Sequence, residues 1–106
     1  MIIKFDKEYL KELFEDGKCS NKKYRFQPEV VTAYGKRVLT LMAANSVEDL
    51  YPIGALHYEV LVGDKKGISS IRINKKYRLE FKVDTSVSGE TVITFCTLTE
   101  ISNHYK

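Results

Sequence analysis

The chain has 106 residues and a net charge of +3, with 43% hydrophobic and 29% charged residues. This composition is typical of a globular protein, and the length predicts one domain over residues 1–106. The first residues lack the basic and apolar regions of a signal peptide, so we expect a cytoplasmic protein without a membrane partner. Cys19 and Cys96 lie far apart without ligand spacing, and the two histidines have no carboxylate cluster, so no metal site is predicted. The sequence contains no Walker A or GxGxxG motif, and no other cofactor is predicted.

The N-terminal half predicts a short strand and two helices. The strand covers residues 1–5. A first helix follows between Asp6, a favourable N-cap, and Gly17, a common helix stop. After a basic connector at 18–27, a second helix is predicted over 28–45, since proline is tolerated in a first helical turn. An apolar stripe at helical spacing marks its buried side and comprises Val30, Val31, Tyr34, Val38, Leu41 and Met42.

The second half predicts strands. Alternating apolar and polar residues, and one more apolar run, place these strands at 56–62, 71–74, 76–83 and 91–98. Turn or loop signals separate them at 63–67 and 86–90. We therefore expect an α+β fold, in which a short N-terminal strand and two helices pack on one face of a mostly antiparallel sheet.

Basic residues cluster in one segment of the second half. Between Lys65 and Arg78 the chain carries six bases and no acid, a local field that favours phosphate contacts. The alternative interpretation is a solvated strand face with basic turns. The six residues are Lys65, Lys66, Arg72, Lys75, Lys76 and Arg78.

Strand alternation predicts which side chains share the sheet face away from the helices. If the helices cover Leu79, then Arg78 lies on the opposite face. The same parity places Arg72, His57 and Glu59 on that face. We therefore expect an open, basic sheet surface that suits an RNA phosphodiester.

The stretch from Leu61 to Phe81 contains Leu-Val-Gly-Asp, Ile-Arg-Ile-Asn and Tyr-Arg-Leu-Glu-Phe, in that order. This block resembles the core of HigB-type toxins, which belong to the RelE/ParE superfamily of bacterial toxin–antitoxin systems. His104 and Tyr105 at the end of the chain resemble the Tyr/His-bearing C-terminus of the same family. Because order and length agree along essentially the whole chain, the resemblance implies a RelE/ParE-like fold.

The resemblance also implies a function. It implies a ribosome-dependent endoribonuclease that cuts messenger RNA without a metal or other cofactor, by attack of the 2′-hydroxyl on the adjacent phosphate. The implied partners are the ribosome, messenger RNA and a cognate helix-turn-helix antitoxin of HigA type. Two alternatives stay open: a ParE-like toxin that acts on DNA gyrase, and a non-catalytic RNA-binding module.

Site residues follow from the same resemblance. Arg78 matches the arginine after the aromatic residue of the motif and would stabilise charge on the phosphoryl oxygens. Tyr105 and His104 would protonate the leaving 5′-oxygen or activate the 2′-hydroxyl. Glu59 holds the position where family members carry a histidine, and His57 lies two residues earlier, so the general base is His57, Glu59 or His104. The expected RNA-binding residues are Lys65, Lys66, Arg72, Lys75 and Lys76.

Overall fold

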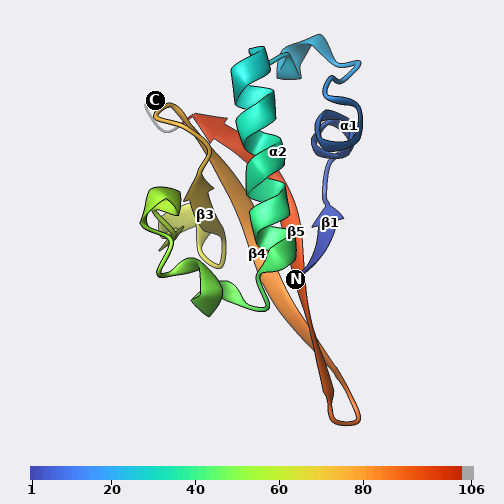
Figure 1. The fold of residues 1–106 in the computed structure, drawn as a ribbon, viewed down its shortest axis with the longest axis vertical. Coiled ribbons are helices and arrows are strands. Elements are labelled where there is room, and N and C mark those ends of the chain that lie inside the picture. Colours follow the sequence, from blue (N-terminus) through green and yellow to red (C-terminus); the bar gives the residue numbers. More distant parts are fainter. Residues whose placement is uncertain (104–106) are drawn as a thin grey trace.

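The computed structural model describes residues 1–103 and shows a five-stranded sheet covered by two helices (Figure 1). The strand order is β1-β5-β4-β3-β2, and only the pairing of β1 with β5 is parallel. The strands are β1 (Ile2–Phe5), β2 (Glu59–Val60), β3 (Ser69–Arg72), β4 (Tyr77–Ser88) and β5 (Thr91–Asn103). The helices are α1 (Glu8–Asp16) and α2 (Pro28–Ala43), and short 3₁₀ turns are η1 (Lys22–Tyr24), η2 (Val47–Leu50), η3 (Gly54–Leu56) and η4 (Gly63–Lys65). The predicted α+β architecture is confirmed.

The core lies between the two helices and one face of the sheet. Fully buried side chains from both layers meet there, including Leu10, Tyr34, Val38, Leu41, Ile71, Leu79, Phe81, Cys96 and Leu98. The one polar atom that Tyr34 brings into this core is paired, since its hydroxyl donates to the Leu10 carbonyl at 2.7 Å. Of the helices in residues 1–103, none is long and apolar enough to span a membrane.

The helix ends follow local backbone chemistry, with one difference from the prediction. Gly17 ends α1 in the left-handed conformation at φ 74°, and its N–H donates to the Leu13 carbonyl. The predicted N-cap Asp6 is wrong by one residue, because Lys7 occupies that position. The Asp6 N–H instead donates to the Leu98 carbonyl at 2.9 Å, which continues the pairing of β1 with β5. Pro28 stands in the first turn of α2, as predicted.

The β4–β5 hairpin is longer than the sequence pattern indicates. The predicted loop at 86–90 shrinks to a turn at Gly89–Glu90, and β5 continues beyond its predicted end at residue 98. A β-bulge explains the second difference, because Glu80 pairs with Glu100 while Phe81 pairs with Leu98. One extra β5 residue reverses the phase of alternation, so the apolar pattern breaks although the strand continues. Residues 84–92 at the far end of this hairpin are all exposed, and they project beyond the helices as an arm (Figure 1).

The predicted strand at 56–62 is wrong over most of its length. Only Glu59–Val60 forms β2, and His57 ends η3 in the left-handed conformation at φ 46°. A left-handed residue cannot continue an extended strand, so pairing with β3 starts after it. The apolar alternation in this segment does not mark one buried strand face, since Leu56 is buried in the core whereas Val62 is exposed.

Candidate active site

The sheet face away from the helices carries a cleft around Arg78. Its volume is about 220 Å³. Cross-strand pairing brings the side chains around Arg78 together, because Arg78 stands opposite Arg72 on β3 and opposite Ser102 on β5. Its lining residues are Glu59, Leu61, Lys65, Ser70, Arg78, Glu80, Ser102 and Asn103. The cleft therefore combines both charge signs with two serine hydroxyls.

Arg78 is the more deeply buried of the two cations that line the cleft. Its side chain is only 7% exposed, and its Nε donates to the Ser70 hydroxyl at 2.9 Å. Its Nη2 donates to the His57 carbonyl at 2.5 Å and lies 3.5 Å from a Glu59 carboxylate oxygen. These contacts fix the direction of the planar guanidinium, which presents its remaining donors in a rigid fork.

The charge of Arg78 is set by opposing effects. Burial lowers the pKa of the Arg78 guanidinium from its usual value, and the neighbouring charge of Arg72 lowers it further. The carboxylates of Glu59 and Glu80 act in the opposite direction. Because an arginine pKa starts above ~12, Arg78 stays protonated at neutral pH.

Lys65 forms a second charged group beside Arg78. Its ammonium donates to both Glu80 oxygens at 3.0 and 2.9 Å and lies 3.5 Å from Glu100. The hydrogen bond to Glu80 raises the pKa of Lys65. Because Glu80 and Glu100 stand directly opposite each other on β4 and β5, Lys65 offsets the repulsion between them.

The structure corrects the expected open, basic surface. Arg78 does lie on the face away from the helices, as parity predicted, but Arg78 and Glu80 are both buried there. The His57 imidazole does not come from a strand, and the contact of this residue with Arg78 is made by its backbone carbonyl. The surface is thus a cleft of paired charges rather than an exposed array of bases.

The other predicted residues occupy different places. Arg72 is half-buried next to Arg78, and Lys66 is exposed just after η4. Lys75 and Lys76 are exposed in the turn between β3 and β4. His104 and Tyr105 lie outside the described residues.

Three residues that pair with the cations of the cleft were not predicted. Ser70, Glu80 and Glu100 all contact the cations of the cleft. The parity that located Arg78 also indicates Glu80, two residues further along the same strand. Glu100 gives no such signal, because the bulge reverses the phase of β5 just before it. In residues 1–103 no three His, Cys, Asp or Glu side chains come together as a metal-binding group.

Comparison with known proteins identifies the family. Residues 3–95 match the family described as RelE-like toxin of type II toxin-antitoxin system HigB. The chain belongs to this HigB-like toxin family. It is 34% identical over 94 residues to Toxin HigB-1 of Vibrio cholerae serotype O1, which covers 88% of this chain and 95% of that toxin.

Two solved structures share the fold of this HigB-like toxin. The YoeB/ParE toxin from Agrobacterium tumefaciens matches with a TM-score of 0.55 and 18% identity, covering 99% of this chain and 100% of that one. YafQ from E. coli matches with a TM-score of 0.52 and 13% identity, covering 96% and 91%. Membership of a type II toxin family implies a cognate antitoxin, and toxins of this family are generally endoribonucleases.

Proposed function

We propose that this HigB-like toxin is a ribosome-dependent endoribonuclease that cuts messenger RNA by attack of the 2′-hydroxyl on the adjacent phosphate. The observation that carries the proposal is the fixed Arg78 guanidinium in the cleft on the sheet face. The general ribonuclease character of the family supports the same reaction class.

The reaction needs charge stabilisation and two proton transfers. The bond from the 2′-oxygen to phosphorus forms while the bond from phosphorus to the 5′-oxygen breaks, which leaves a cyclic phosphate and a free 5′-hydroxyl. Negative charge builds on the phosphoryl oxygens meanwhile. Within the described residues, hydrogen bonds engage two of the five N–H donors of Arg78, and the remaining donors can bind these oxygens.

The proton-transfer groups are proposed from their positions. Glu59 lines the cleft beside Arg78 with its carboxylate half exposed, so it is the general base that the cleft favours over His57. Asn103 lines the same cleft, and His104 and Tyr105 follow it in the sequence. We assign to one of these two residues the role of general acid, which donates a proton to the leaving 5′-oxygen.

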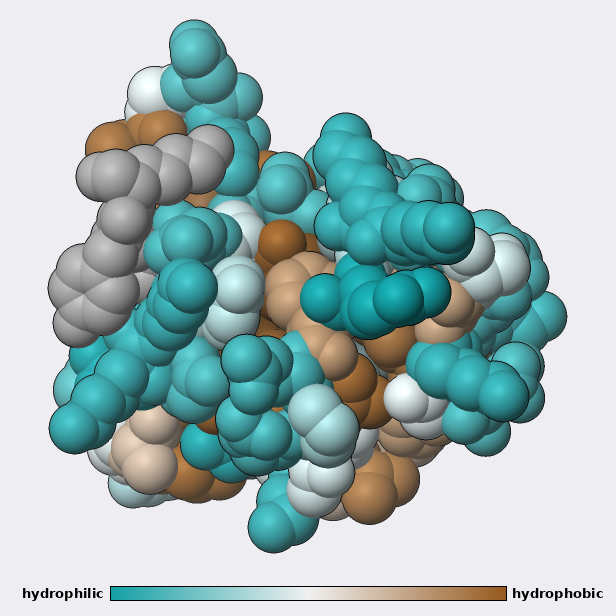
Figure 2. Space-filling model, turned by 90° about the horizontal axis from the view of Figure 1, so that it is seen from above, coloured by the Kyte–Doolittle hydropathy of each residue, from teal (hydrophilic) through white to brown (hydrophobic). Residues whose placement is uncertain are grey.

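The RNA backbone would bind next to the cleft. Lys66, Lys75 and Lys76 are exposed, and within residues 1–103 no carboxylate forms an ion pair with any of them. The end of the molecule that carries the turn of Lys75 and Lys76 is largely hydrophilic (Figure 2). Arg72 and Lys65 complete the proposed RNA-binding set, with Lys65 also paired to Glu80 and Glu100.

Induced expression with mapping of messenger-RNA 5′ ends tests this function. Wild type is compared with Arg78→Ala, with His104→Ala/Tyr105→Phe and with Lys82→Ala, an exposed control on β4. We expect growth arrest and new in-frame cuts in translated messages for wild type and for the control, and neither effect for the two site variants. Co-purification with the antitoxin verifies that each variant folds.

Two other outcomes would contradict the nuclease. Arrest without new 5′ ends but with DNA-damage signalling would identify a gyrase-directed toxin. Growth without arrest, together with salt-sensitive RNA binding by the purified protein, would identify a non-catalytic binding module.

A further inference from the structure

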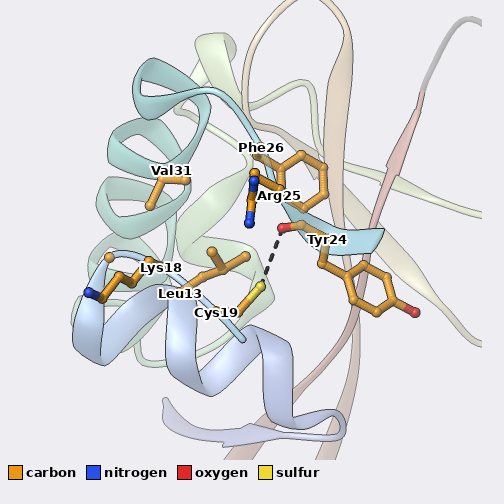
Figure 3. A pocket seen from close by; sticks show the side chains of 8 residues that line it. Leu13, Lys18, Cys19, Tyr24, Arg25, Phe26 and Val31 are labelled. Carbon is orange, nitrogen blue, oxygen red and sulfur yellow. Dashed lines mark hydrogen bonds between the residues drawn. The ribbon is translucent and has the colours of Figure 1, made fainter. Parts of the chain in front are cut away.

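A second pocket lies away from the Arg78 cleft, between the C-terminal end of α1, the connector at 18–27 and the start of α2 (Figure 3). Its volume is about 200 Å³. Leu13, Phe26 and Val31 contribute apolar walls, whereas Lys18 and Arg25 bring positive charge and Cys19 a thiol. We call it the α1–α2 pocket. It shares no lining residue with the cleft.

The connector forms this pocket through contacts of its own. Asn21 caps η1, its side chain accepting from the Lys23 N–H at 3.0 Å. The Cys19 thiol, which points toward the Tyr24 backbone in Figure 3, donates to the Tyr24 carbonyl at 3.4 Å. The Tyr24 ring stacks on Tyr9 with 3.7 Å between ring centroids. The walls are therefore in place before anything binds.

The size of the pocket limits its occupant. Pockets for drug-sized ligands enclose about 300–1,000 Å³, so a cavity of about 200 Å³ suits a single large side chain. A buried apolar anchor of this kind is the usual centre of a protein–protein contact. A stacked nucleobase fits less well, because the Tyr24 ring is already covered on one face by Tyr9.

The charges near the pocket also favour a peptide over a nucleic acid. Residues 17–28 contain Lys18, Lys22, Lys23 and Arg25 and no acid. Across Cys19, however, the adjoining hollow is lined by Glu12 and Asp16 of α1. These carboxylates repel a nucleic-acid backbone that crosses Lys18, whereas a peptide can place an acidic side chain on the bases alone.

We propose that the α1–α2 pocket binds a segment of the cognate antitoxin, with one apolar side chain in the pocket and a neighbouring Asp or Glu on Lys18 and Arg25. The antitoxin is inferred as the partner because the chain belongs to a toxin–antitoxin family. The chemistry of the bound segment is inferred from the charge and size of the pocket. The proposal does not depend on RNA cleavage, because the cleft and the pocket are separate.

Cysteine alkylation of the toxin, alone and in complex with its antitoxin, tests this contact. Cys19 is half-buried at the pocket, whereas Cys96 is fully buried in the core and serves as an internal control for folding. We expect the antitoxin to slow maleimide labelling of Cys19 at least tenfold, with Cys96 unlabelled in both samples. Equal labelling of Cys19 in both samples would overturn the proposal.

Charge reversal and pocket filling provide the second measurement. We expect Lys18→Glu, Arg25→Glu and Val31→Trp each to weaken antitoxin binding by at least tenfold in calorimetry. Lys82→Glu is the matched control and is expected to bind like wild type, because it lies on β4 outside the pocket. Unchanged antitoxin affinity in the pocket variants, with loss of ribosome binding instead, would assign the connector to RNA and refute the proposal.

Discussion

The direction of the Arg78 guanidinium depends on two neighbours that have no charge of their own. The Ser70 hydroxyl and the His57 carbonyl accept from it, and Ser70 is almost completely buried. A buried cation that loses such a partner keeps its desolvation cost without the compensating bond. Ser70 is therefore expected to position Arg78 rather than to contact RNA.

Ser70→Ala tests this positioning role. We expect the free energy of unfolding to fall by about 1–3 kcal/mol, because one hydrogen bond to a buried charged group is lost. Urea unfolding measures this, with the exposed Ser86→Ala on the β4 arm as control. Cleavage should also fall through a lower kcat, since a misdirected guanidinium no longer matches the transition state. Equal stability and equal kcat for both variants would contradict the role.

The pairing of Lys65 with Glu80 predicts a pH effect. A lysine whose folded pKa is raised contributes stability below its unfolded pKa of ~10.4 and loses it as pH rises through the folded pKa. In Lys65→Met, Glu80 stays buried without this cation. We expect destabilisation below the about 3–5 kcal/mol of a broken buried ion pair, because Lys65 is itself 43% exposed to the screening solvent and Arg78 remains nearby.

Unfolding in urea between pH 7 and pH 11.5 checks the sign. The stability difference between wild type and Lys65→Met should stay constant up to about pH 10 and then shrink as the wild-type ammonium loses its proton. A difference that persists unchanged to pH 11.5 would show that Lys65 acts through packing and not through charge.

At the scale of elements, local signals in the sequence predicted the fold well where periodicity and chain breakers agree. Gly17 ends α1 and Pro28 begins α2 as expected. The arm was missed because its Thr, Ser and Gly residues resemble a loop, although regular pairing continues to Ser88 and Thr91. Strand parity predicted the side of the sheet on which Arg78 lies. It could not predict the carbonyl contact of His57, since alternation carries no information about a left-handed residue.

The backbone at His57 yields a prediction about the start of β2. At φ 46° a β-branched side chain is strained, whereas Gly and Asn tolerate this conformation. We expect His57→Val to lose about 1–2 kcal/mol of stability, with His57→Gly and His57→Asn close to wild type. Thermal unfolding measures the series. Because the contact with Arg78 uses the carbonyl, His57→Asn should also retain cleavage, and its complete loss would assign a catalytic role to the imidazole.

Because of the bulge in β5, single-residue deletions on its two sides are expected to affect folding differently. Removing Thr99, the residue between the partners of Glu80 and Phe81, leaves Leu98 and Ile101 on the core face. Removing Thr97 instead shifts Leu98 to the opposite face, because one residue reverses the alternation. We expect the Thr99 deletion to fold with a lowered midpoint and the Thr97 deletion not to fold, as judged by circular dichroism. Equal behaviour of the two deletions would show that the bulge does not set the register.

Across the whole molecule, the two proposed functions lie on separate surfaces. The Arg78 cleft lies on the sheet face away from the helices, and the α1–α2 pocket lies at the ends of the helices. The pocket and the cleft share no lining residue. Binding of the antitoxin segment at the pocket is therefore expected to hold the toxin independently of whatever covers Arg78.

The projecting arm has a consequence for how the molecule approaches its target. Residues 84–92 of the arm contain Asp84 and Glu90 but no basic residue, and the arm points away from the end that carries the basic connector and the turn of Lys75 and Lys76 (Figure 1). We expect this separation of charge, along a molecule 44 Å long, to turn the basic end toward a polyanion before contact. We expect Asp84→Lys/Glu90→Lys to change the association rate with ribosomes at low salt but not at high salt, while the dissociation rate stays the same. Stopped-flow kinetics across ionic strengths measures this orientation, and rates equal to wild type at every salt concentration would show that the arm plays no part in it.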